Sequence, residues 1–174
     1  MTEEIKKHVI SILVDNEFGA LARIVDLFSG RGYNIESLNV APINKEKTLS
    51  RVNITTFGTD KTVDLICKLL NRIVPVHKAA ELSKQEGYIE RELTLLKIIG
   101  DADKKAKALV IADKNRTNVV DICEDSIVFE IVGSSKTVDK IIEEFSELGI
   151  DSISRTGVAA GFRGNKGLAK ISYN

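Results

Sequence analysis

Residues 15–42 read DNEFGALARIVDLFSGRGYNIESLNVAP, and they contain the most regular pattern of turn, helix and strand in the sequence. The stretch opens with an Asn-x-x-Gly turn and then places apolar side chains at helical spacing, which predicts a helix with one buried face. The residues on that face are Leu21, Ile24, Val25 and Phe28. Gly30 and Gly32 end the helix. Residues 34–43 then form a strand that stops near Pro42, so the stretch predicts a helix followed by a strand.

The residues on either side extend this pattern to a complete unit. HVISILV, at residues 8–14, is an almost continuous apolar run and predicts a well-buried strand before the helix. Residues 49–58 alternate as a strand, Asp60 caps a second helix that Pro75 stops, and residues 76–82 form a fourth strand. The order β-α-β-β-α-β predicts the ferredoxin-like fold, with both helices on one face of an antiparallel sheet.

The second half of the chain repeats this order of elements. The polar stretch 83–90 separates the halves. The predicted strands are 92–99, 118–123, 126–132 and 150–155, and the predicted helices are 102–116 and 136–148. We expect Ala106, Leu109 and Val110 to face inward from the first of these helices, and Val138, Ile141, Ile142 and Phe145 from the second. The sequence therefore predicts an α+β protein with two ferredoxin-like domains, 1–84 and 85–174.

The apolar character of the strands bears on assembly. A sheet with helices on one face needs polar side chains on its other face if water reaches it. The strands at 8–14 and 127–132 have few such residues. We therefore expect the second face of each sheet to be covered by the other domain or by another chain. The basic, Gly-rich tail, 155–174, is either solvated or a docking segment for a partner.

Composition excludes several kinds of partner. The chain has 25 basic and 25 acidic residues, whereas a nucleic-acid-binding protein carries a basic excess. An RNA-binding sheet also needs exposed aromatic side chains, and the chain has only three tyrosines and six phenylalanines. No stretch approaches the ~18 apolar residues of a membrane span, and the first residues lack the apolar core of a signal peptide. We expect a cytoplasmic protein that binds neither nucleic acid nor membrane.

Catalytic and metal-binding motifs are missing from the sequence. Cys67 and Cys123 do not form a CxxC pair, and His8 lies far from His77 in sequence, so we expect no metal site and regard both cysteines as small core residues. There is no Gly-x-Ser-x-Gly and no phosphate-binding loop. Acylphosphatases have a ferredoxin-like fold, but they need an arginine-bearing phosphate loop where this chain has the acidic DNEFG. We expect no catalytic residues.

The turn at residues 16–19 is the candidate binding site. A helix start points free N–H groups outward, where they can hold a carboxylate. Gly19 lets a small ligand approach the backbone, and Asn16 offers both a donor and an acceptor. These features suit a free amino acid. The alternative is a plain strand-to-helix turn, where Asn and Gly are common in any case.

The same residues carry a resemblance to a known family. NEFGALARIVDLF and SGRGYNIESLNVAP, together residues 16–42, closely resemble the opening of acetolactate synthase small subunits. The resemblance continues in LSR at 49–51, in YIERELTLLKI at 88–98 and more weakly in RTGVAAGFRG at 155–164, so that it covers essentially the whole chain. It implies an ACT regulatory domain at 1–84 and a smaller C-terminal domain.

The resemblance also implies a function. Small subunits of this family bind and activate a catalytic large subunit in branched-chain amino-acid biosynthesis and confer feedback inhibition by valine or a related end product. The thiamine diphosphate, Mg²⁺ and FAD of the reaction belong to that partner, so no cofactor is expected in this chain. The alternative function is a free-standing ACT-type sensor that acts on another enzyme.

In this family the effector lies between the ACT domains of a homodimer. On the matching positions, Asn16 and Gly19 of one chain and Asn34 and Ile35 of the other would hold the amino acid. The apolar residues after the turn would contact its side chain: Ala20 and Leu21. The sequence departs from the family at Phe18, where relatives often carry a small residue or proline. A benzyl group there is expected to close or narrow the pocket.

Overall fold

The computed structural model describes residues 4–84 and 87–168. They form two units, one of residues 4–84 and 87–89 with 158–168 and one of residues 90–157. The predicted division at residue 85 assigned the whole C-terminal segment to the second domain, and the structure differs on this point. Residues 85 and 86 at the predicted boundary, and residues 169–174 of the predicted tail, lie outside the described residues.

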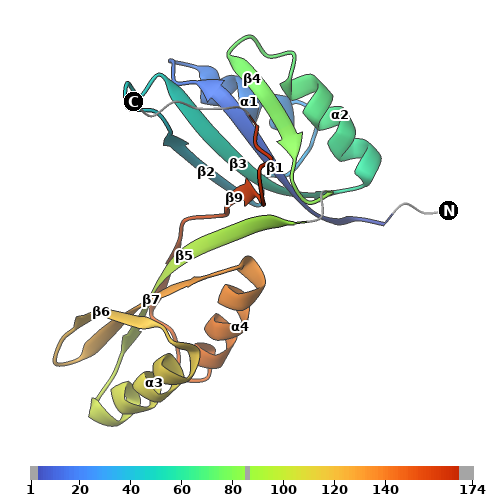
Figure 1. Ribbon diagram of the computed structural model, residues 1–174. Helices are drawn as coiled ribbons and strands as arrows, with labels where there is room; N and C mark the ends of the chain where they lie inside the picture. Colours follow the sequence, from blue (N-terminus) through green and yellow to red (C-terminus); the bar gives the residue numbers. More distant parts are fainter. Residues whose placement is uncertain (1–3, 85–86, 169–174) are drawn as a thin grey trace. The chain divides into compact units, whose positions relative to one another are not determined.

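The first unit has the predicted ferredoxin-like order. Its elements are β1 (Lys6–Asp15), α1 (Ala20–Ser29), β2 (Ser37–Pro42), β3 (Leu49–Gly58), α2 (Asp60–Leu70) and β4 (Val76–Glu81). The strands form an antiparallel sheet in the order β2-β3-β1-β4. Both helices cover the same face of this sheet, as Figure 1 shows. The predicted fold of this half is confirmed.

Strand register builds the core beneath these helices. Ile10 lies opposite Ile54 and Ile12 opposite Val52, so the four side chains share one face of the sheet. All four are fully buried, as are the two side chains that meet them from the helices: Ile24 and Ile66. Burial of each large aliphatic side chain stabilises the fold by about 1.5–3 kcal/mol. This core fixes where α1 begins relative to the end of β1.

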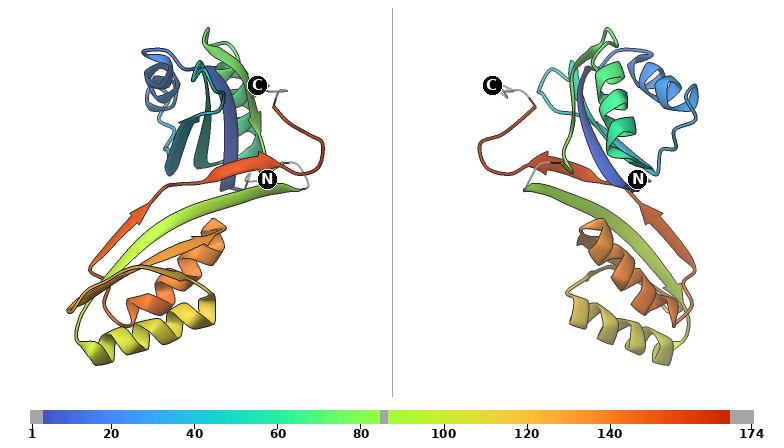
Figure 2. Two further views of the ribbon diagram at one scale, coloured as in Figure 1. Left: turned by 60° about the vertical axis from the view of Figure 1, so that its left-hand side comes forward. Right: turned by 90° about the vertical axis from the view of Figure 1, so that its right-hand side faces the viewer.

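The opposite face of the sheet receives the C-terminal segment of the chain. Strand β9 (Ala159–Phe162) pairs with β5, and the Arg163 N–H donates to the Gly87 carbonyl at 2.8 Å. Val9 and Leu82 form a separate apolar cluster with Val158 and Ala160. In the right-hand view of Figure 2, α1 and α2 lie on one side of β1 and the segment after β9 runs along the other. This burial explains why residues 158–168 belong to the first unit.

The second unit repeats the same topology. Its elements are β5 (Tyr88–Ile99), α3 (Ala102–Asn115), β6 (Asn118–Ile122), β7 (Ser126–Gly133), α4 (Ser135–Ser146) and β8 (Ser152–Arg155). The strand order is β6-β7-β5-β8, equivalent to that of the first sheet. Phe129 and Phe145 meet in its core with ring centroids 4.8 Å apart. The predicted fold class, an α+β chain with two ferredoxin-like units, is confirmed.

Two predictions about side chains in this half are wrong. Helix α3 buries Ala108 and Ala112, whereas Leu109 and Val110 are exposed. The small alanine side chains let the helix lie close to the sheet, and the stripe with the larger residues is turned outward. Cys123 is exposed because it follows the edge strand β6, so it is not a core residue. The inward face predicted for α4 is correct at Val138, Ile141 and Phe145.

Candidate effector site

A cleft of about 170 Å³ lies where β1 ends and α1 begins. It draws its walls from β1, the turn, α1, β2 and β3. The lining residues are Val14, Asp15, Asn16, Glu17, Ala20, Leu21, Val40, Ser50 and Val52. A free amino acid is small enough for such a cleft, and the turn predicted as a binding site forms one side of it.

Hydrogen bonds to the neighbouring loop hold the turn in place. The Asn16 N–H donates to the Thr48 carbonyl at 2.7 Å, and Asn16 Nδ2 donates to the Lys47 carbonyl at 2.7 Å. Gly19 has a φ of 82°, in the left-handed region that glycine adopts without strain. A Cβ atom built on Gly19 would meet nothing within 4 Å. The turn therefore presents open space in front of the first residues of α1.

The start of α1 differs from the other helix starts. In α2, α3 and α4 a side-chain oxygen at the N-cap accepts a hydrogen bond from the backbone N–H three residues on: Thr59, Asp101 and Ser134. The N-cap of α1 is Gly19, which has no side chain to do this, and the first turn carries no acidic residue. Helix starts bear a partial positive charge and unpaired N–H groups. This end of α1 is thus suited to an external carboxylate.

Two carboxylates, those of Asp15 and Glu17, also line the cleft. The Asp15 carboxylate is 2.6 Å from His77 Nε2, which ties the end of β1 to β4. The Glu17 carboxylate is 3.3 Å from Arg23 Nη1. Both carboxylates lie on the cleft wall, so the site offers anionic groups as well as the positive helix start. Such a distribution fits a zwitterion, which carries an ammonium and a carboxylate on one carbon.

The apolar part of the cleft comes from residues on two sides. Val14 and Val52 are buried on the helix-facing side of the sheet. Leu21 and Val40 are 38% and 42% exposed. Leu21 was predicted both as a core residue and as an effector contact, and the structure places it in the cleft. A ligand side chain or a second protein chain would remove these partly exposed groups from water.

The six predicted effector-binding residues divide into two groups. Asn16, Ala20 and Leu21 line the cleft, and Gly19 lies in the turn between them. Asn34 and Ile35 are at the far end of α1. There Asn34 Nδ2 donates to Glu36 Oε1 at 2.7 Å, and Ile35 packs against the core. One chain alone therefore does not bring the two groups together.

Six lining residues were not among the predicted effector contacts. Val14, Asp15 and Glu17 lie close to Asn16 in the chain, whereas the other three are distant in sequence: Val40, Ser50 and Val52. They come from β2 and β3, whose register places Ser50 beside Val14 and Val40 beside Val52. Alternation in β3 indicated which side chains share a face, but not which of them lie beside the turn. Phe18, predicted to close or narrow the pocket, is fully exposed and is not among the residues that line it.

One group of potential metal ligands occurs in residues 4–84 and 87–168, well away from the cleft: His8, Asp60 and Glu81. Their ligand atoms lie within 4.8 Å of one another. However, Lys6 Nζ is 3.0 Å from Asp60 and Lys84 Nζ is 3.4 Å from Glu81, so ammonium groups already neutralise both carboxylates.

None of the helices in the described residues is both long enough and apolar enough to span a membrane.

Comparison with known families gives two matches that together cover most of the chain. Residues 10–78 match the AHAS small subunit-like ACT domain. Residues 91–164 match the small subunit of acetolactate synthase. These ranges correspond to most of the two repeated units of the fold.

Similar proteins extend the match to nearly the full length. A probable acetolactate synthase small subunit of Archaeoglobus fulgidus is 37% identical over 160 residues, which are 92% of this chain and 99% of that protein. The acetolactate synthase small subunit of Haemophilus influenzae is 37% identical over 163 residues, 93% of this chain and 99% of that protein. The crystal structure of the acetolactate synthase small subunit from Thermotoga maritima superposes with a TM-score of 0.83 at 31% identity, covering 92% of this chain and 99% of that one.

Proposed function

The chain belongs to the family of acetolactate synthase small subunits, and from this premise we propose that it is a regulatory subunit controlled by valine or a related end product. In this proposal it binds the catalytic large subunit and raises its activity. The effector binds the cleft at the start of α1 and shifts the complex toward a less active arrangement. Such control needs a coupling free energy of typically ~1–3 kcal/mol between the two sites.

The observation that carries the proposal is the start of α1. Of the four helices in the described residues, α1 alone begins at a glycine with no side-chain cap. It opens onto a cleft lined by Val14, Val52 and Asp15. The helix start would hold the effector carboxylate, Asp15 would attract its ammonium, and the valines would contact an aliphatic side chain.

A second copy of the chain would complete the site. β2 is an edge strand of the first sheet, and Val40 on it is 42% exposed beside the cleft. An edge strand offers unpaired backbone groups to a partner. In a homodimer formed through the ACT domains, Asn34 and Ile35 of one copy would approach the cleft of the other. A two-fold dimer would then contain two equivalent sites.

The large subunit would supply the chemistry. The family assigns thiamine diphosphate, Mg²⁺ and FAD to that partner, and we propose that this chain holds none of them and is not catalytic. Its location in the cytoplasm stays a prediction. The alternative, a free-standing sensor of another enzyme, shares the cleft and differs only in its partner.

Two measurements test this function. The purified chain should form no acetolactate from pyruvate with thiamine diphosphate, Mg²⁺ and FAD, but should increase the rate of the large subunit from the same organism. Titration calorimetry of the isolated chain with valine, leucine and isoleucine should identify the effector. If the chain neither binds nor stimulates that large subunit, the regulatory role is wrong. If it binds one of these amino acids and co-purifies with a different enzyme, the alternative is correct.

A further inference from the structure

The face of the first sheet that points away from α1 and α2, here called the outer face, carries a group of neighbouring polar side chains. In β1 and β3 the residues that alternate with the core point to this face, and among them are Ser11, Arg51, Asn53 and Thr55. Ser11 lies directly opposite Asn53 in the antiparallel ladder. Strand β2 adds Ser37, opposite Thr55. Three strands therefore contribute polar side chains to one surface.

Most of these side chains are buried without a hydrogen-bond partner. Ser11 is 1% exposed, and Asn53 and Thr55 are each 4% exposed. Within the described residues, seven buried side-chain atoms lack a partner, and five of them belong to the outer face. The five are Ser11 Oγ, Ser37 Oγ, Arg51 Nε, Asn53 Oδ1 and Thr55 Oγ1. Buried polar atoms in folded proteins are nearly always paired, so a contiguous unpaired set that includes a guanidinium indicates a binding surface.

Two cations on the outer face have no counterion. Arg51 on β3 and Lys78 on β4 both lie opposite Leu13 of β1, one on each side of it. Burial lowers the pKa of the Arg51 guanidinium, and no neighbouring carboxylate offsets this effect. Neither cation forms an ion pair with any part of the chain that the structure describes. The nearest carboxylate along β1, that of Asp15, is already paired with His77 at 2.6 Å.

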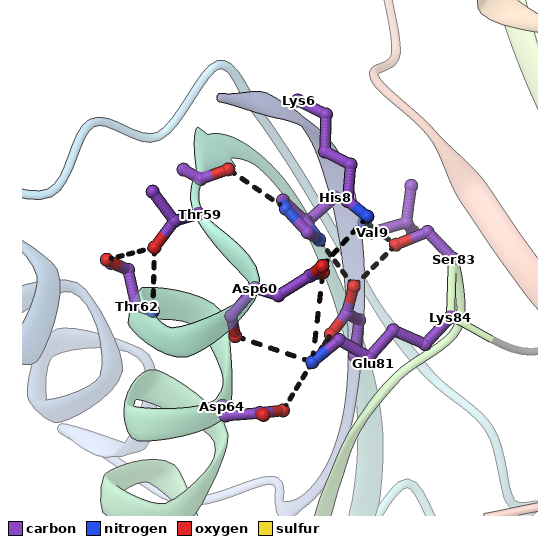
Figure 3. Close-up of polar contacts among 11 residues, drawn as sticks. Lys6, His8, Val9, Thr59, Asp60, Thr62, Asp64, Glu81, Ser83 and Lys84 are labelled. Carbon is purple, nitrogen blue, oxygen red and sulfur yellow. Dashed lines mark hydrogen bonds and ion pairs between the residues drawn. The ribbon is translucent and has the colours of Figure 1, made fainter. Parts of the chain in front are cut away.

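The other end of β1 shows how the same unit pairs its charges internally. Figure 3 shows Lys84 between carboxylates of α2 and β4, with its Nζ 2.6 Å from Asp64 and 3.4 Å from Glu81. Lys6 Nζ is 3.0 Å from Asp60. The cations in that cluster have partners within the chain, whereas Arg51 has none. An anion that neutralises Arg51 would therefore come from another molecule.

The C-terminal segment of the chain lies along the outer face but does not supply this anion. It packs on Val9 and Leu82, at the side of the face formed by β1 and β4. Its described part, residues 158–168, contains Arg163 and Lys166 and no acidic residue. Such a segment adds positive charge to the surface, so the outer face favours an acidic partner.

The side of the outer face formed by β2 and β3 is accessible to such a partner. Ala41, opposite Arg51, is exposed, and Asn39, opposite Asn53, is half-buried. The unpaired set includes a donor, Arg51 Nε, an acceptor, Asn53 Oδ1, and hydroxyls that can be either. A polypeptide segment offers both backbone N–H and carbonyl groups, and an acidic side chain on it can form two parallel hydrogen bonds with a guanidinium.

We propose that the outer face docks an acidic segment of the large subunit, with Arg51 and Lys78 as the cations that hold it. This inference rests on the proposed function, which names the large subunit as the partner. The Arg51 side chain turns outward to a carboxylate of the segment, whose backbone pairs with the neighbouring hydroxyls and amide. Ser50 and Val52 line the effector cleft, so in β3 the residues of the cleft and of the docking surface alternate. A shift of β3 on effector binding would reach both.

Titration of the large subunit from the same organism with the chain tests the surface. At low salt, Arg51→Gln should weaken binding about tenfold or more, because the carboxylate of the partner loses its cation. High salt should reduce this difference by screening the charges. Arg51→Lys should recover part of the affinity, and Lys78→Gln, an exposed position, should also weaken binding. Lys68→Gln removes an exposed cation from α2, on the helix side of the same unit, and should bind like the unaltered chain.

The possible outcomes separate this proposal from the proposed function. If Arg51→Gln and the unaltered chain bind the large subunit equally well, the docking surface is wrong while the regulatory role stands. If the unaltered chain does not bind the large subunit, both are wrong. If Arg51→Gln instead dissociates dimers of the chain in sedimentation and keeps its affinity for the large subunit, the outer face is a contact between copies and the proposal is overturned.

Urea denaturation of the isolated chain tests whether Arg51 lacks a partner. Arg51→Met removes the charge and keeps an aliphatic side chain, so the denaturation midpoint should not fall, since burial of an unpaired charge opposes folding. Arg155→Met is the comparison, because it leaves the buried Glu92 carboxylate without its counterion and should lower the midpoint. If Arg51→Met lowers the midpoint as far as Arg155→Met does, Arg51 is paired within the chain and the proposal is wrong.

Discussion

The side-chain amides of Asn16 and Asn34 are held at opposite ends of α1 by unrelated parts of the chain. Asn16 Nδ2 donates to the Lys47 carbonyl and Asn34 Nδ2 to the Glu36 carboxylate, each at 2.7 Å. The 10-residue helix between them spans about 15 Å at 1.5 Å per residue. A single amino acid cannot contact both side chains within one chain. If both residues bind the effector, each site must combine two copies of the protein.

Mixed dimers test this division. Asn16→Ala and Asn34→Ala homodimers should each bind no effector, because every site lacks one of the two amides. After the two variants are unfolded and refolded together, roughly a quarter of the original sites should return, since half of randomly paired dimers are mixed and each has one intact site. Calorimetric titration would count the sites. No recovery in dimers shown to be mixed would mean that the effector binds within one chain or elsewhere.

Gly19→Asp should abolish feedback inhibition while stimulation of the large subunit persists. The new carboxylate would repel the carboxylate of the effector at the start of α1. A Cβ atom at this position meets nothing within 4 Å, so the main cost is the left-handed backbone, about 1 kcal/mol. Gly19→Asn has nearly the same shape without the charge and is the matched control. If the inhibition curves of the two variants coincide, charge at this turn does not affect feedback inhibition.

Arg155→Met should destabilise the second unit by about 2 kcal/mol. Breaking a fully buried ion pair would cost more, but Arg155 is partly exposed. Glu92 is 4% exposed and accepts from both Nε and Nη2 of Arg155, so the variant leaves a buried carboxylate without its counterion. Lys114→Met is the control: Lys114 is 67% exposed in its pair with Glu144 and should contribute less than about 1 kcal/mol. Equal shifts in urea denaturation midpoints would contradict this difference.

The two cysteines should differ in reactivity. Burial raises the pKa of Cys67 to about 11, so it is a neutral thiol at pH 8, whereas Cys123 is exposed. Iodoacetamide at pH 8 should therefore modify Cys123 first, since the thiolate is the nucleophile and access is needed. Mass spectrometry of tryptic peptides would follow both sites. In urea both should react at similar rates, and fast labelling of Cys67 in the folded chain would disagree with its burial.

Helix α3 shows where sequence periodicity fails. Its apolar side chains form two competing stripes, and the larger residues Leu109 and Val110 suggested the wrong one. In α1 and α4 the large side chains occupy a single stripe and the inward faces were predicted at Ile24, Phe28 and Phe145. The exposed Leu95, Ile99 and Val132 alternate with core residues of the second sheet. That the other domain or another chain covers this face stays a prediction.

The two β-α-β-β-α-β units and the turn with Asn16 and Gly19 were predictable from the sequence, because periodicity, caps and turn residues act over a few neighbouring positions. Two relationships became visible only in the folded chain: Val40 and Ser50 complete the cleft, and Glu81 contacts His8 from 73 residues away in the chain. Such contacts depend on strand order and register. Those are set by the packing of the whole core, which no local pattern of residues encodes.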